Sequence, residues 1–109
     1  MRDTHLPTFV YGLVDPRWCP PEGLIFYVGI TISPGYRLYT HRHDPCSVAW
    51  QRIREIEVLS GYETEMNILA EFANRQDAFD LEHRLICTLP NLVNRDKRRF
   101  RVHNYAGAA

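Results

Sequence analysis

Hydrophobic and polar positions alternate in the manner of β-strands near the start of the chain. Residues 8–14 place three large side chains on one face and two valines on the other, and residues 24–31 form a second apolar run of strand length. Three of the seven prolines lie between these segments and predict a loop, which favours an antiparallel pair. Glycine interrupts each strand, at Gly12 and Gly29, and such a glycine marks a bulge or a close approach of backbone or ligand.

The pattern then changes to helical spacing. Ser33-Pro34 is typical of a helix start, with serine as N-cap and proline in the first turn, and this helix is predicted to end near His43. A second helix is predicted from residue 47 to about residue 60. Its expected core stripe consists of Val48, Ala49, Ile53, Ile56 and Leu59.

Residues 63–72 predict a third strand, with weaker alternation. Asn74 is the expected N-cap of a third helix that runs to about Leu89, with Asp77 in its first turn. A short extended piece is expected at residues 92–94. The order β-β-α-α-β-α therefore predicts a mixed α/β (α+β) fold with helices packed on a small sheet.

Length and composition indicate one soluble domain. The chain has 109 residues, of which 45% are hydrophobic and 24% charged, which suffices for a single core. No apolar run approaches the roughly 18 residues that span a bilayer, and the N-terminus lacks the apolar segment of a signal peptide. We expect one cytoplasmic domain, with its core at 8–95 and a tail at 96–109. Three cysteines without recurring spacing, Cys19, Cys46 and Cys87, are expected to be reduced.

The net charge is zero but unevenly distributed. The segment from Asn91 onward has a surplus of four positive charges, which leaves the remainder with four negative ones. Because binding depends on the local field, a neutral total is compatible with a polyanionic partner. The basic residues of this tail are Arg95, Lys97, Arg98, Arg99 and Arg101.

Several polar side chains fall where a purely structural pattern would not need them. Glu82 lies within the apolar stripe of the third helix, where a carboxylate is costly unless it is paired or bound to a cation. Arg37 and His41 are four residues apart, on one face of the first helix. Each feature has a plain alternative, because Glu82 can reach water at the stripe's edge and the other two can form a solvated helix face.

Taken together these residues predict a site. With one tyrosine on each of the first two strands, Tyr11 and Tyr27, they supply phenols, a cationic clamp, a proton acceptor and a metal ligand. Those are the components of phosphodiester cleavage. Taken singly, the tyrosines could instead hold their hydroxyls in water. A zinc site at His41, His43 and Cys46 is disfavoured, because the spacing is tight and no second ligand pair follows.

At these positions the sequence resembles the GIY-YIG nucleases. Phe9-Val10-Tyr11 stands where the family has Gly-Ile-Tyr, and Tyr27-Val28-Gly29 matches Tyr-Ile-Gly. Arg37 stands at the family's helix arginine, and His41 matches the RxxxH form of some branches. The opening VYGLVDP…FYVG is most similar to a branch in which the first motif is relaxed to VYxLxDP.

Two further positions extend the likeness over residues 8–95. Glu82 matches the metal-binding glutamate and Asn94 the asparagine of a closing element. The chain departs from the pattern at Phe9, which replaces the first glycine, and at Ile30, which replaces a frequent basic residue and removes one possible phosphate contact.

The resemblance implies a three-stranded antiparallel sheet flanked by helices and a divalent-metal-dependent DNA endonuclease. Tyr11 or Tyr27 would help activate water, with Tyr11 preferred as the base, and Arg37 would bind the scissile phosphate. His41 would assist proton transfer, Glu82 would hold one Mg²⁺ or Mn²⁺ ion, and Asn94 would position its neighbours. DNA is the implied partner, contacted by Gly29, Arg37 and the basic tail, with a homodimer or a partner protein supplying specificity.

Two other functions stay open. The first is a nucleic-acid-binding module of the same fold that does not cut, which the lack of a second, DNA-binding domain suggests. The second is a zinc-stabilised interaction domain that uses Cys46 and the histidines.

Overall fold

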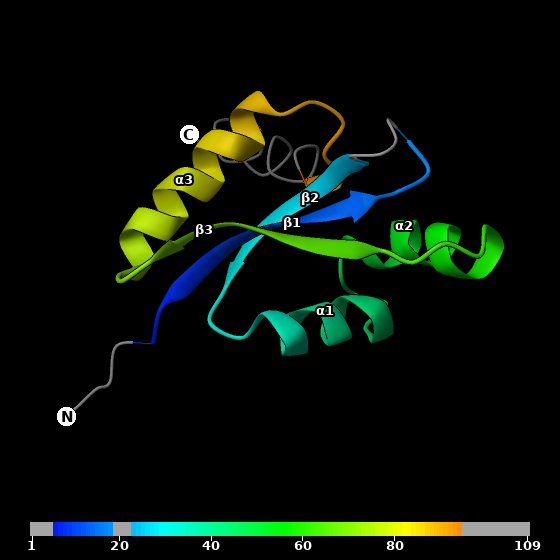
Figure 1. The fold of residues 1–109 in the computed structure, drawn as a ribbon, viewed down its shortest axis with the longest axis horizontal. Coiled ribbons are helices and arrows are strands. Elements are labelled where there is room, and N and C mark those ends of the chain that lie inside the picture. Colours follow the sequence, from blue (N-terminus) through cyan, green and yellow to red (C-terminus); the bar gives the residue numbers. More distant parts are fainter. Residues whose placement is uncertain (1–5, 19–22, 95–109) are drawn as a thin grey trace, which may run out of the picture.

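The computed structural model describes residues 6–18 and 23–94 (Figure 1). The chain folds as an α+β protein with the predicted order β-β-α-α-β-α. Cys19 and the predicted basic contacts of the tail lie outside the described residues. None of the helices within the described ranges is long and apolar enough to cross a lipid bilayer.

The three strands form one antiparallel sheet with the order β2-β1-β3. The first two, β1 (Thr8–Asp15) and β2 (Leu24–Thr31), confirm the predicted strands, and β3 (Glu65–Phe72) begins two residues later than predicted. The register between β1 and β2 shifts next to Leu13, where β2 carries one extra residue, Phe26. This bulge lets Phe26 and Tyr27 pack into the same core cluster although they are neighbours in sequence.

The first and last helices confirm the predicted boundaries and most of the predicted capping. Helix α1 (Pro34–His43) begins with proline in its first turn, although Ser33 makes no side-chain cap bond. Helix α3 (Arg75–Thr88) is capped by Asn74, whose side-chain oxygen accepts the Asp77 amide at 2.8 Å.

The predicted second helix is shorter and less regular. Helix α2 (Trp50–Arg54) starts after a turn closed by the Trp50 amide on the Ser47 carbonyl, and it continues as a π-helical turn, η1 (Glu55–Leu59). In η1 the Ser60 amide bonds the Glu55 carbonyl, a spacing of five residues. This wider turn rotates Leu59 off the core face, so the prediction that Leu59 is buried was wrong: it is 78% exposed.

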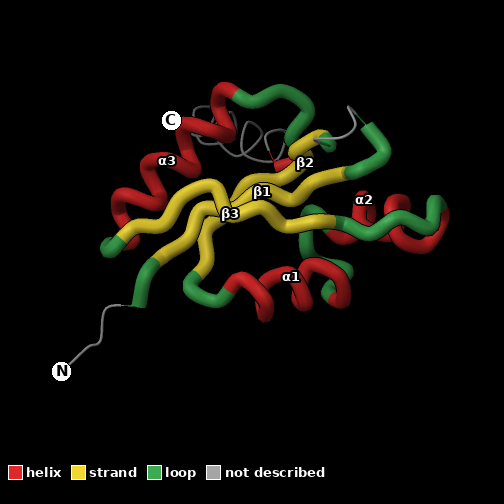
Figure 2. Tube along the Cα trace, viewed as in Figure 1, coloured by secondary structure: helices red, strands yellow, loops and turns green. Residues whose placement is uncertain are grey.

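Helices cover both faces of the sheet (Figure 2). Helix α3 lies on one face, and α1 and α2 lie on the other. The core has two clusters, one on each side of the sheet. The cluster on the α2 side contains Tyr11, Leu13, Phe26, Ala49, Ile53 and Ile56, and the cluster on the α3 side contains Val10, Val28, Ala78, Ile86 and Leu92. The expected extended piece at residues 92–94 is absent, because Val93 and Asn94 are helical.

Candidate active site

The site centres on a buried tyrosine–histidine pair. Tyr11 is fully buried in the middle of β1, and its hydroxyl lies 2.8 Å from Nε2 of His41 on α1. The other ring nitrogen of His41, Nδ1, lies 2.6 Å from Oγ of Ser47. Ser47 is held in turn by the Ala49 amide, which donates to its Oγ at 3.2 Å. Both nitrogens of His41 are therefore engaged, which fixes the ring.

Gly29 makes room for the Tyr11 ring. The two residues face each other across the β1–β2 ladder. A Cβ atom at Gly29 would lie 2.6 Å from the Tyr11 hydroxyl oxygen and 2.7 Å from its ring carbon Cζ. The predicted close approach at this glycine is thus an approach of the Tyr11 side chain. Its predicted contact with nucleic acid stays a prediction.

Tyr27 and Arg37 complete this side of the site. Tyr27 is half-buried, and its ring packs edge-on against His41 with centroids 4.7 Å apart. Arg37 is an exposed residue of α1 that interacts through its guanidinium with the hydroxyls of Tyr11 and Tyr27. The structure therefore brings four of the predicted residues together: Tyr11, Tyr27, Arg37 and His41.

Burial and neighbouring charge keep Tyr11 and His41 neutral. Burial, and then the nearby Tyr27, raise the pKa of Tyr11 far above its usual value, although Arg37 opposes this. Burial and the Arg37 charge lower the pKa of His41 to about 4. Burial lowers the pKa of Arg37, but the interactions with Tyr11 and Tyr27 together outweigh this and raise it, so the guanidinium stays charged. At neutral pH a neutral phenol and a neutral imidazole thus lie beside a cation.

Asn94 binds the backbone of the edge strand β2. Its Nδ2 donates to the Val28 carbonyl at 2.6 Å, and its Oδ1 lies 3.5 Å from the Val28 amide. Val28 stands between Tyr27 and Gly29, so Asn94 holds the strand that carries both. This contact supports the predicted positioning role of Asn94.

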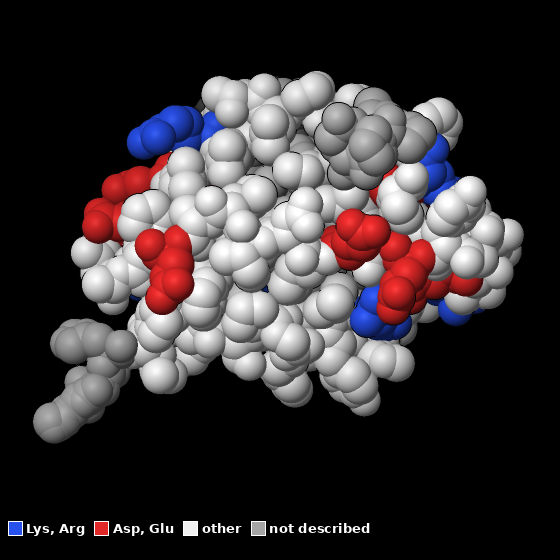
Figure 3. All heavy atoms as spheres, viewed as in Figure 1, with Lys and Arg blue, Asp and Glu red and all other residues white. Residues whose placement is uncertain are grey.

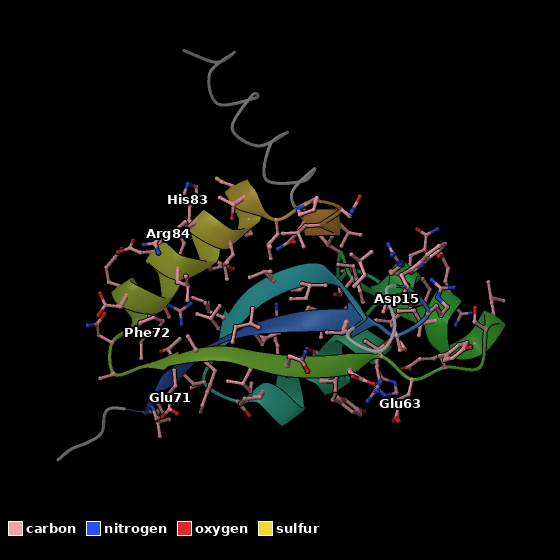
Figure 4. The ribbon with its side chains drawn as sticks, turned by 45° about the horizontal axis from the view of Figure 1, so that its top comes forward. Asp15, Glu63, Glu71, Phe72, His83 and Arg84 are labelled. Carbon is pink, nitrogen blue, oxygen red and sulfur yellow. The ribbon has the colours of Figure 1, made fainter. Side chains whose placement is uncertain are left out.

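Glu82 lies on the other layer of the molecule. It is half-buried on α3, whose neighbouring positions Leu81 and Leu85 pack against Val10 and Val28. His83 and Arg84 on the same helix turn away from the sheet (Figure 4). The sheet therefore separates the helix of Glu82 from the helix of Arg37 and His41.

Within the described ranges, no group of three or more His, Cys, Asp or Glu side chains is placed to hold a metal ion. A zinc site at His41, His43 and Cys46 is disfavoured, because His41 uses both ring nitrogens in hydrogen bonds. Cys46 and Cys87 are free thiols, as expected. A single carboxylate remains compatible with Mg²⁺, which keeps several water ligands.

The contacts of two polar residues, Ser47 and Asp15, were not predicted from the sequence. Ser47 was assigned to a helix start, and nothing in its local sequence links it to His41. Asp15 was assigned to the end of a strand, yet it is fully buried and accepts Arg17 Nη2 at 2.7 Å and Arg52 Nε at 3.1 Å. Burial would raise the pKa of Asp15, but the hydrogen bonds from both arginines lower it overall. Asp15 ties β1 to α2 at the end of the sheet (Figure 4).

Comparison with models of known protein families, with curated proteins and with solved structures finds no match to this chain. Fold and site together define an α+β protein that carries a hydrogen-bonded Tyr11–His41–Ser47 group, with Arg37 beside it, on one face of a three-stranded sheet.

Proposed function

We propose that the chain is a divalent-metal-dependent DNA endonuclease of the GIY-YIG type. The observation that carries this proposal is the cluster of Tyr11, Tyr27, His41 and Arg37, which converge from two strands and one helix. A fixed cation next to phenol hydroxyls and a neutral imidazole suits attack of water on a phosphodiester. The assignment to GIY-YIG nucleases and to DNA rests on the sequence resemblance.

Tyr27 is the better placed of the two tyrosines to meet the attacking water. Tyr11 exposes no surface, whereas Tyr27 is partly exposed and interacts with the Tyr11 hydroxyl. We propose that the water proton passes to Tyr27 as the Tyr27 proton passes to Tyr11 and the Tyr11 proton to Nε2 of His41. This path needs the tautomer with hydrogen on Nδ1, which Ser47 can accept. The sequence resemblance favoured Tyr11 alone as the base. We propose instead that Tyr11 and Tyr27 act together.

Arg37 links phosphate binding to proton transfer. Its guanidinium would bind the scissile phosphate and stabilise the charge that builds on it. Its charge is also one of the two causes that lower the pKa of His41. An anionic phosphate at Arg37 offsets that charge, so His41 becomes a stronger base when substrate is bound.

Glu82 would hold the metal ion. When bound, Mg²⁺ supplies positive charge to the phosphate oxygens and the leaving group. One carboxylate is a ligand of the type that Mg²⁺ takes, because Mg²⁺ is commonly bound through one or two carboxylates plus water and substrate phosphate. Because α3 lies across the sheet from α1, the DNA backbone would have to pass the edge strand β2 to meet both Glu82 and Arg37.

The proposal is tested by incubating purified protein with supercoiled plasmid and Mg²⁺ or Mn²⁺, with and without EDTA. We expect nicking that EDTA and Glu82→Ala both abolish. Asp80→Ala on the exposed face of the same helix is the matched control and should cut normally. Absence of cutting on duplex, branched and single-stranded DNA would contradict the proposal.

The alternative is a nucleic-acid-binding module of the same fold that does not cut. The full burial of the Tyr11 hydroxyl favours it, because a buried phenol is shielded from water. This function requires DNA binding that is unaffected by EDTA and by Glu82→Ala.

A further inference from the structure

Helix α1 carries a row of exposed aromatic rings. Tyr36 is 68% and Tyr39 58% exposed, and their rings stack with centroids 6.4 Å apart and planes 21° apart. The Tyr39 ring lies 4.2 Å from that of His43. Spacings of three and four residues place these side chains along one helix face. We call Tyr36, Tyr39 and His43 the aromatic row.

The side chains of the aromatic row do not pack in the hydrophobic core. The opposite face of α1 supplies the buried His41 and the half-buried Leu38. Three rings that contact one another in water are already restricted in rotation, so a flat ligand that stacks on them loses little further side-chain entropy.

The helix of the row carries no negative charge that would repel an anionic partner. Helix α1 contains no Asp or Glu. Arg42 is paired with Glu57 at 3.0 Å, but no carboxylate of the described residues forms an ion pair with Arg37. In the space-filling view, acidic side chains gather over β3 and the end of α2, while the edge where α1 runs is drawn mostly white (Figure 3). Arg37 follows Tyr36 on the same helix, about 100° round its axis, so the row and the proposed phosphate site lie on neighbouring faces of α1.

We propose that the aromatic row stacks unpaired bases of the nucleic acid whose phosphate Arg37 binds. This inference rests on the proposed function and deepens it, because it assigns the substrate class. Base stacking on aromatic side chains is tolerant of sequence, since every base presents a π-face. Bases inside a duplex are stacked on one another, so the row selects single-stranded or locally unpaired DNA.

The test is fluorescence titration, in EDTA, of a single-stranded oligonucleotide containing 2-aminopurine and of the same sequence as a duplex. We expect Tyr36→Ala/Tyr39→Ala to weaken single-strand binding about fivefold or more and to weaken duplex binding much less. Because no charge is removed, the dependence of log affinity on log salt should not change. Tyr36→Phe/Tyr39→Phe, which keeps the rings, should bind normally, as should Tyr62→Ala, which removes a ring 54% exposed outside α1.

The outcomes with the alanine variant and with the plasmid assay separate this inference from the proposed function. If the double alanine variant binds single strands normally, or loses single-strand and duplex binding equally, the inference is wrong whether or not the protein cuts DNA. If the alanine variant instead changes only the oligomeric state, the row is an interface between copies and the inference is again wrong. If stacking is confirmed but the plasmid assay shows no cutting, the inference stands and the nuclease proposal fails. A wild-type chain that binds no DNA overturns both.

Discussion

The buried imidazole of His41 makes folding stability depend on pH. Its pKa is about 4 in the folded chain against 6.5 ordinarily, so folding favours the neutral ring. This contribution is complete above pH 6.5 and is lost as the pH falls toward 4, because protons then bind the unfolded chain preferentially. Between pH 7 and 5 the loss is on the order of 2 kcal/mol.

Urea unfolding at pH 7 and pH 5 measures this dependence. His41→Gln should flatten it, while His43→Gln, at an exposed position, should leave it as in wild type. Equal pH dependence in all three proteins would show that the His41 pKa is not lowered by folding.

Two glycines give a matched test of the packing under Tyr11. Gly29→Ala should destabilise the fold by about 1–3 kcal/mol, because its methyl group would overlap the Tyr11 ring and strain the bond to His41. Gly35→Ala should be neutral or slightly stabilising, because a Cβ there meets nothing within 4 Å and the residue lies in α1. Thermal unfolding compares the two, and similar shifts for both variants would contradict the packing.

At the level of elements, the edge of β2 depends on a side chain. Asn94 supplies the hydrogen bonds that a fourth strand would otherwise give to Val28. Asn94→Ala should therefore speed hydrogen exchange at the Val28 amide and loosen Tyr27 and Gly29. Exchange in the centre of β1, at Gly12, should change far less. Uniform acceleration over the whole sheet would show global destabilisation instead of a local role.

Sequence patterns predicted the elements that are determined by residues close together in the chain. The apolar run of strand length gave β2 at its observed bounds, and the Asn74 cap gave the start of α3. The π-helical turn after Arg54 could not be predicted in this way, because it depends on how the chain returns to β3 and not on apolar spacing. Leu59 is therefore exposed and does not belong to the core stripe that was predicted.

The site was predictable in part for the same reason. The i, i+4 spacing of Arg37 and His41 and the strand positions of the tyrosines are local features. The contact of His41 with Ser47 and the burial of Asp15 between Arg17 and Arg52 arise from tertiary packing, which no spacing encodes.

For the whole molecule, the basic tail is predicted to add phosphate contacts without sequence preference. Replacing Lys97, Arg98 and Arg99 with alanine should weaken DNA binding similarly across sequences. It should also reduce the slope of log affinity against log salt by up to about 0.9 per lost contact. Binding titrations at several salt concentrations measure this, and an unchanged slope would exclude the tail from the interface.

The central claim is that the tyrosine pair and His41 move the proton in phosphodiester cleavage. The most direct measurement is the single-turnover rate of plasmid nicking at saturating protein and Mg²⁺ for Tyr11→Phe, Tyr27→Phe and the control Tyr62→Phe. Each removes one hydroxyl, and Tyr62 is an exposed tyrosine outside the site. We predict that the first two variants lose about a hundredfold or more in rate at a temperature where each is still folded, and that the control keeps its rate. Wild-type rates in both Tyr11→Phe and Tyr27→Phe would contradict the claim.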